Sequence, residues 1–149
     1  GQLQIIGLIL LLQNVTLNLP EYALRLARSF WPGALTLVVP KHPSIPAAVS
    51  ATSSVGVRVP DHSITRMLLR AAGPLAVTSA NLSGRESPAN AREVLEQLDG
   101  RIDLIIDAGQ VGQGLASTVV DCLGVDPVIL REGPVTFGMI QKALAACGG

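Results

Sequence analysis

The chain has 149 residues, of which 48% are hydrophobic and 15% are charged, so it is too apolar for a disordered tail or a solvated linker. Eleven Lys and Arg residues balance eleven Asp and Glu residues, which excludes a general attraction to nucleic acid or to an anionic membrane surface. Aromatic residues make up only 3%, too few for a platform on which bases stack. We expect one globular domain over residues 1–149.

The cellular location of the protein can be predicted from an apolar run at residues 5–12 and from the two cysteines. The run is too short to cross a bilayer and has neither the basic segment nor the cleavage site of a signal peptide, so we expect a buried strand there. Cys122 and Cys147 are too few for a disulfide framework, and no zinc-site spacing occurs. The sequence therefore predicts a reducing compartment, the cytoplasm, and no membrane segment.

Strand-like runs alternate with segments of helical periodicity along the chain. Residues 21–30 place apolar side chains on one stripe of a helix that ends before Pro32 and Gly33. Further helices are expected at residues 64–72, 88–98 and 136–146. Strands are expected at residues 35–39, 55–59, 75–78, 104–107, 117–121 and 128–131. The alternation of strands and helices predicts an α/β fold.

Arg58 stands in a segment where apolar residues alternate with small or polar ones. The alternation puts the valines of residues 54–59 on one face of a strand and Ser54, Gly56 and Arg58 on the other. A guanidinium beside a bare glycine suits a bidentate carboxylate or phosphate ligand. A structural ion pair with an aspartate such as Asp61 or Asp121 is the alternative.

Residues 75–84, LAVTSANLSG, run from an apolar strand into a small polar loop that ends in glycine. Ligands often bind at the ends of strands in α/β sheets, and the side chains of Ser79 and Asn81 can hydrogen-bond phosphate or carboxylate oxygens. An ordinary turn is the alternative. Beyond the loop, Ser87 is expected to cap the next helix with Pro88 at its first position, which would present free N–H groups to an anion.

A glycine-rich loop at residues 109–114 precedes the strand at 117–121. It lacks the lysine of a Walker loop and the context of the dinucleotide fingerprint, but it can close over a ligand. Ser117 follows the loop, and Arg131 ends the next apolar strand. Arginines and serines at strand ends indicate an anionic ligand such as a nucleotide.

The sequence assigns no catalytic residue and no protein ligand for a metal. His42 and His62 are expected to be solvated loop residues, because neither has a second ligand at metal-binding spacing. No Ser-His-Asp or Cys-His set is evident. Asp103, Asp107 and Asp121 could act as acids or Mg2+ ligands, but turn or strand-end roles fit each of them better.

Five motifs follow one another between residues 20 and 138. They are FWPGALTLV at 30–38, VGVRVPDH at 55–62, GPLAVTSANLSG at 73–84, STVVD at 117–121 and ILREG at 129–133. In order and spacing they resemble the YrdC/Sua5 family of threonylcarbamoyl-adenylate synthases in its short, single-domain form. Residues 1–19 match neither the P-T-[DE]-T-x-Y-G-L segment nor the K-x-R motif with which the family begins.

The resemblance implies an open, twisted mixed sheet with flanking helices and a concave nucleotide-binding cavity. It also implies that ATP with Mg2+, L-threonine and bicarbonate become threonylcarbamoyl-AMP and pyrophosphate, for a tRNA modification (t6A) that a separate complex completes. Carried over by position, the ATP-binding residues are Ser54, Ser79, Asn81, Ser87 and Arg131. The threonine-binding residues are Arg58, Val77 through its main chain, and Ser117.

Other interpretations stay open beside the synthase. One is a non-catalytic module of the same fold that binds a nucleotide or RNA, although the balanced charge of the chain argues against strong RNA affinity. Another is an inactive fragment of the synthase. A third is a carbamoyl-adenylate domain like those of hydrogenase-maturation proteins, to which the FWPG and TSANLSG motifs fit less closely.

Overall fold

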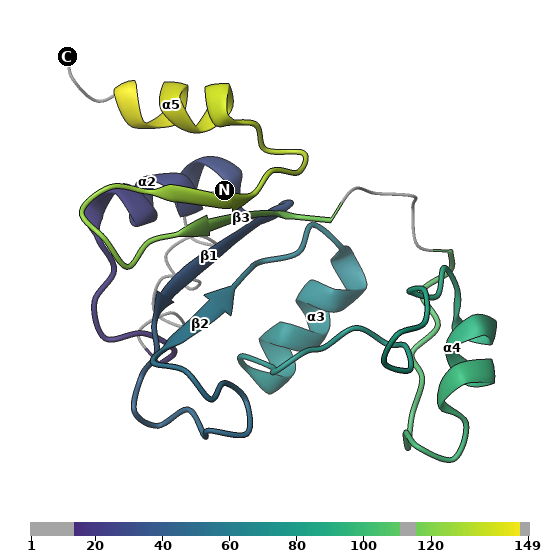
Figure 1. Cartoon of the computed structure of the whole chain (residues 1–149). Coiled ribbons are helices and arrows are strands. Elements are labelled where there is room, and N and C mark those ends of the chain that lie inside the picture. The colour runs from purple at the N-terminus through teal and green to yellow at the C-terminus, as the bar shows by residue number, and fades with distance from the viewer. Residues whose placement is uncertain (1–13, 111–115, 147–149) are drawn as a thin grey trace. The chain divides into compact units, whose positions relative to one another are not determined.

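The computed structural model describes residues 14–110 and 116–146 (Figure 1). Internal contacts divide the chain into two compact units, one within Gly1–Leu75 and Ala116–Gly149 and one within Ala76–Leu115. No helix among the described residues is long and apolar enough to cross a membrane. The single domain over residues 1–149 stays a prediction, and the strand expected at residues 5–12 lies outside the described residues.

The first unit is built on a four-stranded mixed sheet in the order β2-β1-β3-β4. Its strands are β1 (Leu35–Pro40), β2 (Ser54–Val57), β3 (Thr118–Asp121) and β4 (Val128–Arg131). β1 pairs antiparallel with β2 and parallel with β3, and β3 pairs antiparallel with β4. The α/β class, the mixed sheet and four of the predicted strands are confirmed. The concave cavity stays a prediction.

Three helices belong to the same unit and lie within one residue of their predicted bounds. They are α2 (Glu21–Phe30), α3 (Ser63–Ala72) and α5 (Phe137–Ala145). His62 is exposed and caps α3, because its Nδ1 accepts a hydrogen bond from the Thr65 N–H at 3.4 Å. Thr136 caps α5 in the same way through its hydroxyl. His62 is thus exposed, as expected, and it also has a structural role at the start of α3, which was not expected.

One face of the sheet packs against α2, and α2 packs against α5 (Figure 1). Leu35, Leu37 and Val39 of β1 are fully buried in this core, whereas the residues between them are half-buried. The core also contains Ala23, Leu26, Ala27, Trp31, Val59, Val120, Cys122, Val135 and Ile140. Val55 and Val57 of β2 pack against it, which confirms the alternation predicted around Arg58. Because side chains alternate along strands, the small and polar residues lie on the opposite face.

Cys122 is fully buried in this core, and burial together with the Asp121 carboxylate raises the pKa of its thiol from 9.0 to about 12. At pH 8 the native thiol is then protonated, so we expect it to resist alkylation. Above pH 9 the unfolded chain loses this proton before the folded chain does, so the thiol's contribution to stability falls as pH rises from about 9 to about 12.

The measurement is alkylation of a Cys147→Ser variant at pH 8, followed by mass spectrometry. Folded chain should stay unlabelled while chain in urea reacts readily. Equal labelling rates in the two conditions would contradict burial of the Cys122 thiol.

The strands predicted at residues 75–78 and 104–107 are wrong. Neither segment is a strand, and Val77 and Leu104 are 89% and 77% exposed. A strand needs a neighbour to accept and donate its backbone hydrogen bonds, and the described residues provide no such neighbour for either segment. Apolar composition identified these runs but could not show whether a partner strand exists.

Helix α4 (Ala91–Leu98), in the second unit, begins later than predicted. Its N-cap is Asn90, whose Oδ1 accepts from the Glu93 N–H at 3.0 Å, while Glu93 accepts from the Ala89 N–H and the Asn90 side chain, each at 2.8 Å. Ser87 is therefore not the cap, and Pro88 is not the first helical residue. The reciprocal N-x-x-E pattern satisfies more free N–H groups than Ser87 could, and it was readable in the sequence.

We expect Asn90→Ala to destabilise α4 by about 0.5 to 2 kcal/mol, the usual cost of losing an N-cap side chain. Ser87→Ala should change the stability of the helix by less than about 0.5 kcal/mol. Hydrogen exchange of the α4 amide groups measures both effects. Faster exchange in Ser87→Ala than in Asn90→Ala would restore Ser87 as the cap.

Candidate functional site

The face of the sheet opposite the core carries a group of small and polar residues, which we call the polar face. Thr36 and Gly56 lie on it because the residues on either side of each pack into or against the core. Arg131 lies on it because it pairs with Val119, the residue between the buried Thr118 and Val120. The polar face is formed by Thr36, Ser54, Gly56, Ser117 and Arg131, with Arg58 directly after β2.

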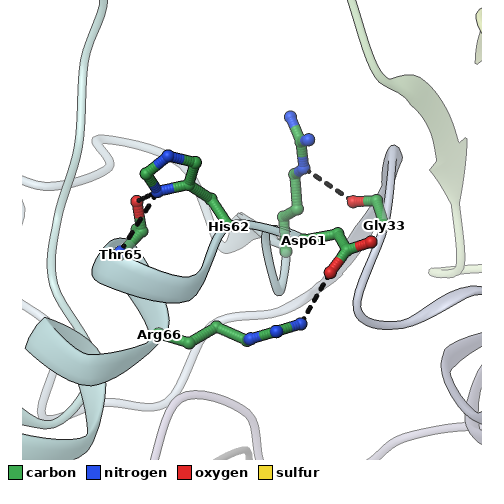
Figure 2. A network of polar contacts seen from close by, with 6 residues as sticks. Gly33, Asp61, His62, Thr65 and Arg66 are labelled. Carbon is green, nitrogen blue, oxygen red and sulfur yellow. Dashed lines mark hydrogen bonds and ion pairs between the residues drawn. The ribbon is translucent and has the colours of Figure 1, made fainter. Parts of the chain in front are cut away.

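Arg58 is held by the turn that follows α2. Its Nε donates to the Gly33 carbonyl oxygen at 2.9 Å (Figure 2). The Gly33 N–H in turn donates to the Val59 carbonyl at 2.8 Å. A side chain on Gly33 would overlap the Phe30 carbonyl oxygen, so this turn requires glycine. Buried Trp31 anchors the turn by donating from Nε1 to the Leu35 carbonyl at 2.7 Å. The FWPG motif thus positions Arg58.

The guanidinium of Arg58 has no carboxylate partner within residues 14–110 and 116–146. Asp61 pairs instead with Arg66, Nη1 to Oδ1 at 2.7 Å (Figure 2), and Asp121 accepts from the Leu123 N–H at 2.8 Å. The predicted alternative of an ion pair with either aspartate is therefore wrong. The terminal nitrogens of exposed Arg58 make no hydrogen bond within the described residues, so they can grip a carboxylate or phosphate.

Ser117 joins three strands of the sheet. Its Oγ lies 2.8 Å from Thr36 Oγ1 on β1, and its carbonyl oxygen accepts from Nε and Nη2 of Arg131 at 3.1 and 2.9 Å. These two contacts orient the Arg131 side chain and leave its Nη1 without a partner among the described residues. The structure therefore brings together two of the predicted ligand-binding residues, Ser117 and Arg131.

A buried threonine that the sequence analysis did not single out supports Ser117. Thr118 Oγ1 donates to the Val135 carbonyl at 2.7 Å and accepts from the Gly133 and Val135 N–H groups at 2.9 and 3.1 Å. A Cβ on Gly133 would overlap the Ala116 carbonyl, so this close approach requires glycine. A hydroxyl residue directly before two valines was the sequence signal for this role.

Ser54 lies at the far end of β2 from Arg58, opposite Pro40. Its carbonyl oxygen accepts from the Ser50 and Thr52 hydroxyls at 2.7 and 3.1 Å. This network shapes the turn that leads into β2. It neither supports nor excludes the predicted nucleotide contact, so ATP binding by Ser54 stays a prediction.

The remaining predicted ligand-binding residues belong to the second unit, within Ala76–Leu115. They are Val77, Ser79, Asn81 and Ser87. Asn81 Nδ2 donates to the Leu82 and Arg85 carbonyls at 3.1 and 2.8 Å, so this side chain holds its own loop. Asn81 Oδ1 is buried without a hydrogen-bond partner among the described residues. That these four residues meet the polar face in one site stays a prediction, as does closure of the loop at 109–114, most of which lies outside the described residues.

Among the described residues, no group of three or more His, Cys, Asp and Glu side chains is arranged to hold a metal ion. The polar face itself carries arginine and hydroxyl donors, which suit oxyanions.

The sequence of the chain matches the model of a known protein family. The family model Sua5_yciO_yrdC, described as "Telomere recombination", matches residues 8–133. The chain belongs to the Sua5/YciO/YrdC family. The match includes all five sequence motifs and residues from both compact units.

Several curated proteins and solved structures are similar to this chain in sequence or in fold. The threonylcarbamoyl-AMP synthase of Bacillus subtilis (strain 168) is 43% identical over 136 residues, 89% of this chain and 39% of that protein. The crystal structure of Pyrococcus abyssi Sua5 complexed with L-threonine has a TM-score of 0.82 and 40% identity over 90% of this chain and 40% of that chain. The crystal structure of Escherichia coli YciO has a TM-score of 0.71 and 31% sequence identity. The match covers 83% of this chain and 61% of the YciO chain. This chain thus spans about two fifths of the length of the first two proteins.

Proposed function

We propose that the protein is a threonylcarbamoyl-AMP synthase, which makes threonylcarbamoyl-AMP and pyrophosphate from ATP, L-threonine and bicarbonate. The observation that carries the proposal is the anchored Arg58 guanidinium, whose terminal nitrogens make no contact within the described residues, on the face that also carries Ser117 and Arg131. A carboxylate is the ligand that such a guanidinium binds best. The Pyrococcus abyssi relative, solved with L-threonine, supports an amino acid as that ligand.

The proposed reaction has two steps. The amine of L-threonine combines with bicarbonate to give a carbamate and water, and a carbamate oxygen then attacks the α-phosphorus of ATP as pyrophosphate leaves. Both steps depend on holding three small substrates in contact and on offsetting negative charge. Mg2+ enters as part of the ATP substrate and offsets charge on the departing pyrophosphate.

Each residue of the polar face has a proposed role in this reaction. Arg58 binds the threonine carboxylate, the Ser117 hydroxyl donates to the same substrate, and Arg131 directs its remaining N–H groups toward the nucleotide. Ser54, Ser79, Asn81 and Ser87 are proposed to contact ATP, and the main chain of Val77 to contact threonine. No general base is proposed, because no carboxylate or imidazole is oriented toward these groups by a contact within the described residues.

We also propose the setting in which the enzyme works. Its product would serve the t6A modification of tRNA, with the transfer to tRNA carried out by a separate complex. The balanced charge of the chain agrees with a step that does not itself hold nucleic acid strongly. The lack of a disulfide framework in the sequence supports the cytoplasm as its location.

Pyrophosphate release tests the proposal. The chain is incubated with ATP, Mg2+ and bicarbonate, with L-threonine, with L-serine or with no amino acid, after circular dichroism has shown that it is folded. Release that depends on L-threonine is the expected result. Binding of ATP or L-threonine without any release would contradict the synthase and favour a non-catalytic binding module.

A further inference from the structure

Thr36 and Ser117 form a pair of hydroxyl groups near the centre of the polar face. Their side-chain oxygens lie 2.8 Å apart, and the contact joins β1 to the start of β3. Each hydroxyl carries one proton. Whichever of the two donates to the other, one O–H group remains for a third partner. The pair therefore offers one donor at a defined place.

Gly56 holds Thr36 in the orientation that this pair needs. A Cβ on Gly56 would come within 3.3 Å of Thr36 Cγ2, so the threonine methyl group lies against bare backbone of β2. Threonine is branched at Cβ, and placing its methyl group also places its hydroxyl group. The absence of a side chain at Gly56 thus leaves room for the Thr36 methyl group in the orientation that places the Thr36 oxygen beside Ser117.

Thr36 also lies between the two residues proposed to bind the amino acid. Leu37 pairs with Val57, so the next positions along this antiparallel ladder are Thr36 and Arg58. Ser117 lies on the other side of Thr36, next to β3. Thr36 pairs with Val119, so Ser117 is also offset by two residues along the strand direction. Two strand spacings and this offset separate Arg58 from Ser117 by roughly 12 Å at the backbone, a distance that the long arginine side chain and one amino acid can fill.

We propose that Thr36 is a positioning residue for the amino-acid substrate: it holds the Ser117 hydroxyl toward the L-threonine whose carboxylate Arg58 binds. This inference rests on the proposed function and deepens it. The family resemblance assigned no role to Thr36. Thr36 acts through Ser117 and is not a catalytic residue.

Two substitutions separate the hydroxyl of Thr36 from its shape. Thr36→Val keeps the methyl contact with Gly56 and removes the hydroxyl, and Thr36→Ser does the reverse. Isothermal titration of the full chain with L-threonine should show affinity about threefold to tenfold weaker in Thr36→Val, the effect of one hydrogen bond between neutral groups. Thr36→Ser should stay within about twofold of wild type, and ATP affinity should not change in either.

Thr16→Val is the matched control. The Thr16 side chain is buried, whereas Thr36 is half-buried, and the Thr16 hydroxyl makes no hydrogen bond with the described residues. The same chemical change there should leave L-threonine affinity unaltered. A loss of affinity as large as that in Thr36→Val would show a general effect of such substitutions and overturn the proposal.

A double-mutant cycle with Ser117→Ala distinguishes positioning from a structural role. If Thr36 acts through Ser117, Thr36→Val weakens L-threonine binding in the wild-type background but not in Ser117→Ala. Equal losses in both backgrounds, or no loss in either while wild type binds, would overturn this inference and leave the proposed function standing. Wild type that binds no L-threonine would instead contradict the proposed function itself.

Discussion

Replacing Arg58 by alanine is expected to weaken L-threonine binding by about tenfold to a hundredfold. The substitution removes a guanidinium whose terminal nitrogens make no contact within the described residues, and hydrogen bonds from a charged donor to a carboxylate are the strongest that this face can offer. Isothermal titration of wild type and Arg58→Ala with L-threonine measures the loss. ATP affinity should change much less.

Two further variants make the Arg58 result specific. Arg28→Ala removes an exposed arginine from the last turn of α2, away from the polar face, and should leave L-threonine affinity unchanged. Arg58→Lys keeps the charge but has no Nε donor for Gly33 and no planar pair of donors, so it should recover only part of the affinity. Full affinity in Arg58→Ala would show that another group binds the carboxylate.

Thr118→Val is expected to destabilise the fold by roughly 3 to 5 kcal/mol. Valine has nearly the same shape as threonine, but it leaves the Val135 carbonyl and the N–H groups of Gly133 and Val135 without their partner in a fully buried place. A loss of this size is a large part of the stability of a typical domain. It should lower Tm by roughly 10 to 15 °C in a thermal unfolding experiment.

Thr118→Ser is the control for this prediction. Serine keeps the hydroxyl and its three contacts and loses one buried methyl group, a cost of about 1 kcal/mol. Its Tm should therefore lie well above that of Thr118→Val. A Thr118→Val Tm close to that of wild type, together with a lower Tm for Thr118→Ser, would show that packing of the methyl group, not the hydrogen bonds, stabilises the segment between β4 and α5.

Local patterns were sufficient to predict the elements of the first unit. Two segments show this, the alternation of residues 54–59 and the apolar stripe of residues 21–30, and each has one face that packs into or against the core. The period of the hydrophobic pattern is enough to identify such a segment as a strand or a helix. The same method failed at residues 75–78 and 104–107. Those runs are apolar, but whether an apolar run becomes a strand depends on a partner that lies elsewhere in the chain.

The start of α4 shows a different kind of error. Ser-Pro at residues 87–88 is a common helix start and predicts a helix from Pro88, but an N-x-x-E pattern begins three residues after Ser87. The structure favours Asn90 because the reciprocal contacts with Glu93 satisfy two backbone N–H groups and the Asn90 amide at once. Both signals were local, so weighing the number of hydrogen bonds each could supply would have predicted the right cap.

The sequence by itself determined the α/β class, the family resemblance and the types of residue on the polar face, because motif order, period and side-chain chemistry are properties of the chain. Only the tertiary structure decided how Arg58 is held and which residues support Ser117. The bond from Arg58 to Gly33 spans 25 residues, that from Thr36 to Ser117 spans 81, and the one from Thr118 to Val135 spans 17. No local pattern specifies such contacts, because they form only when strand pairing brings distant segments together.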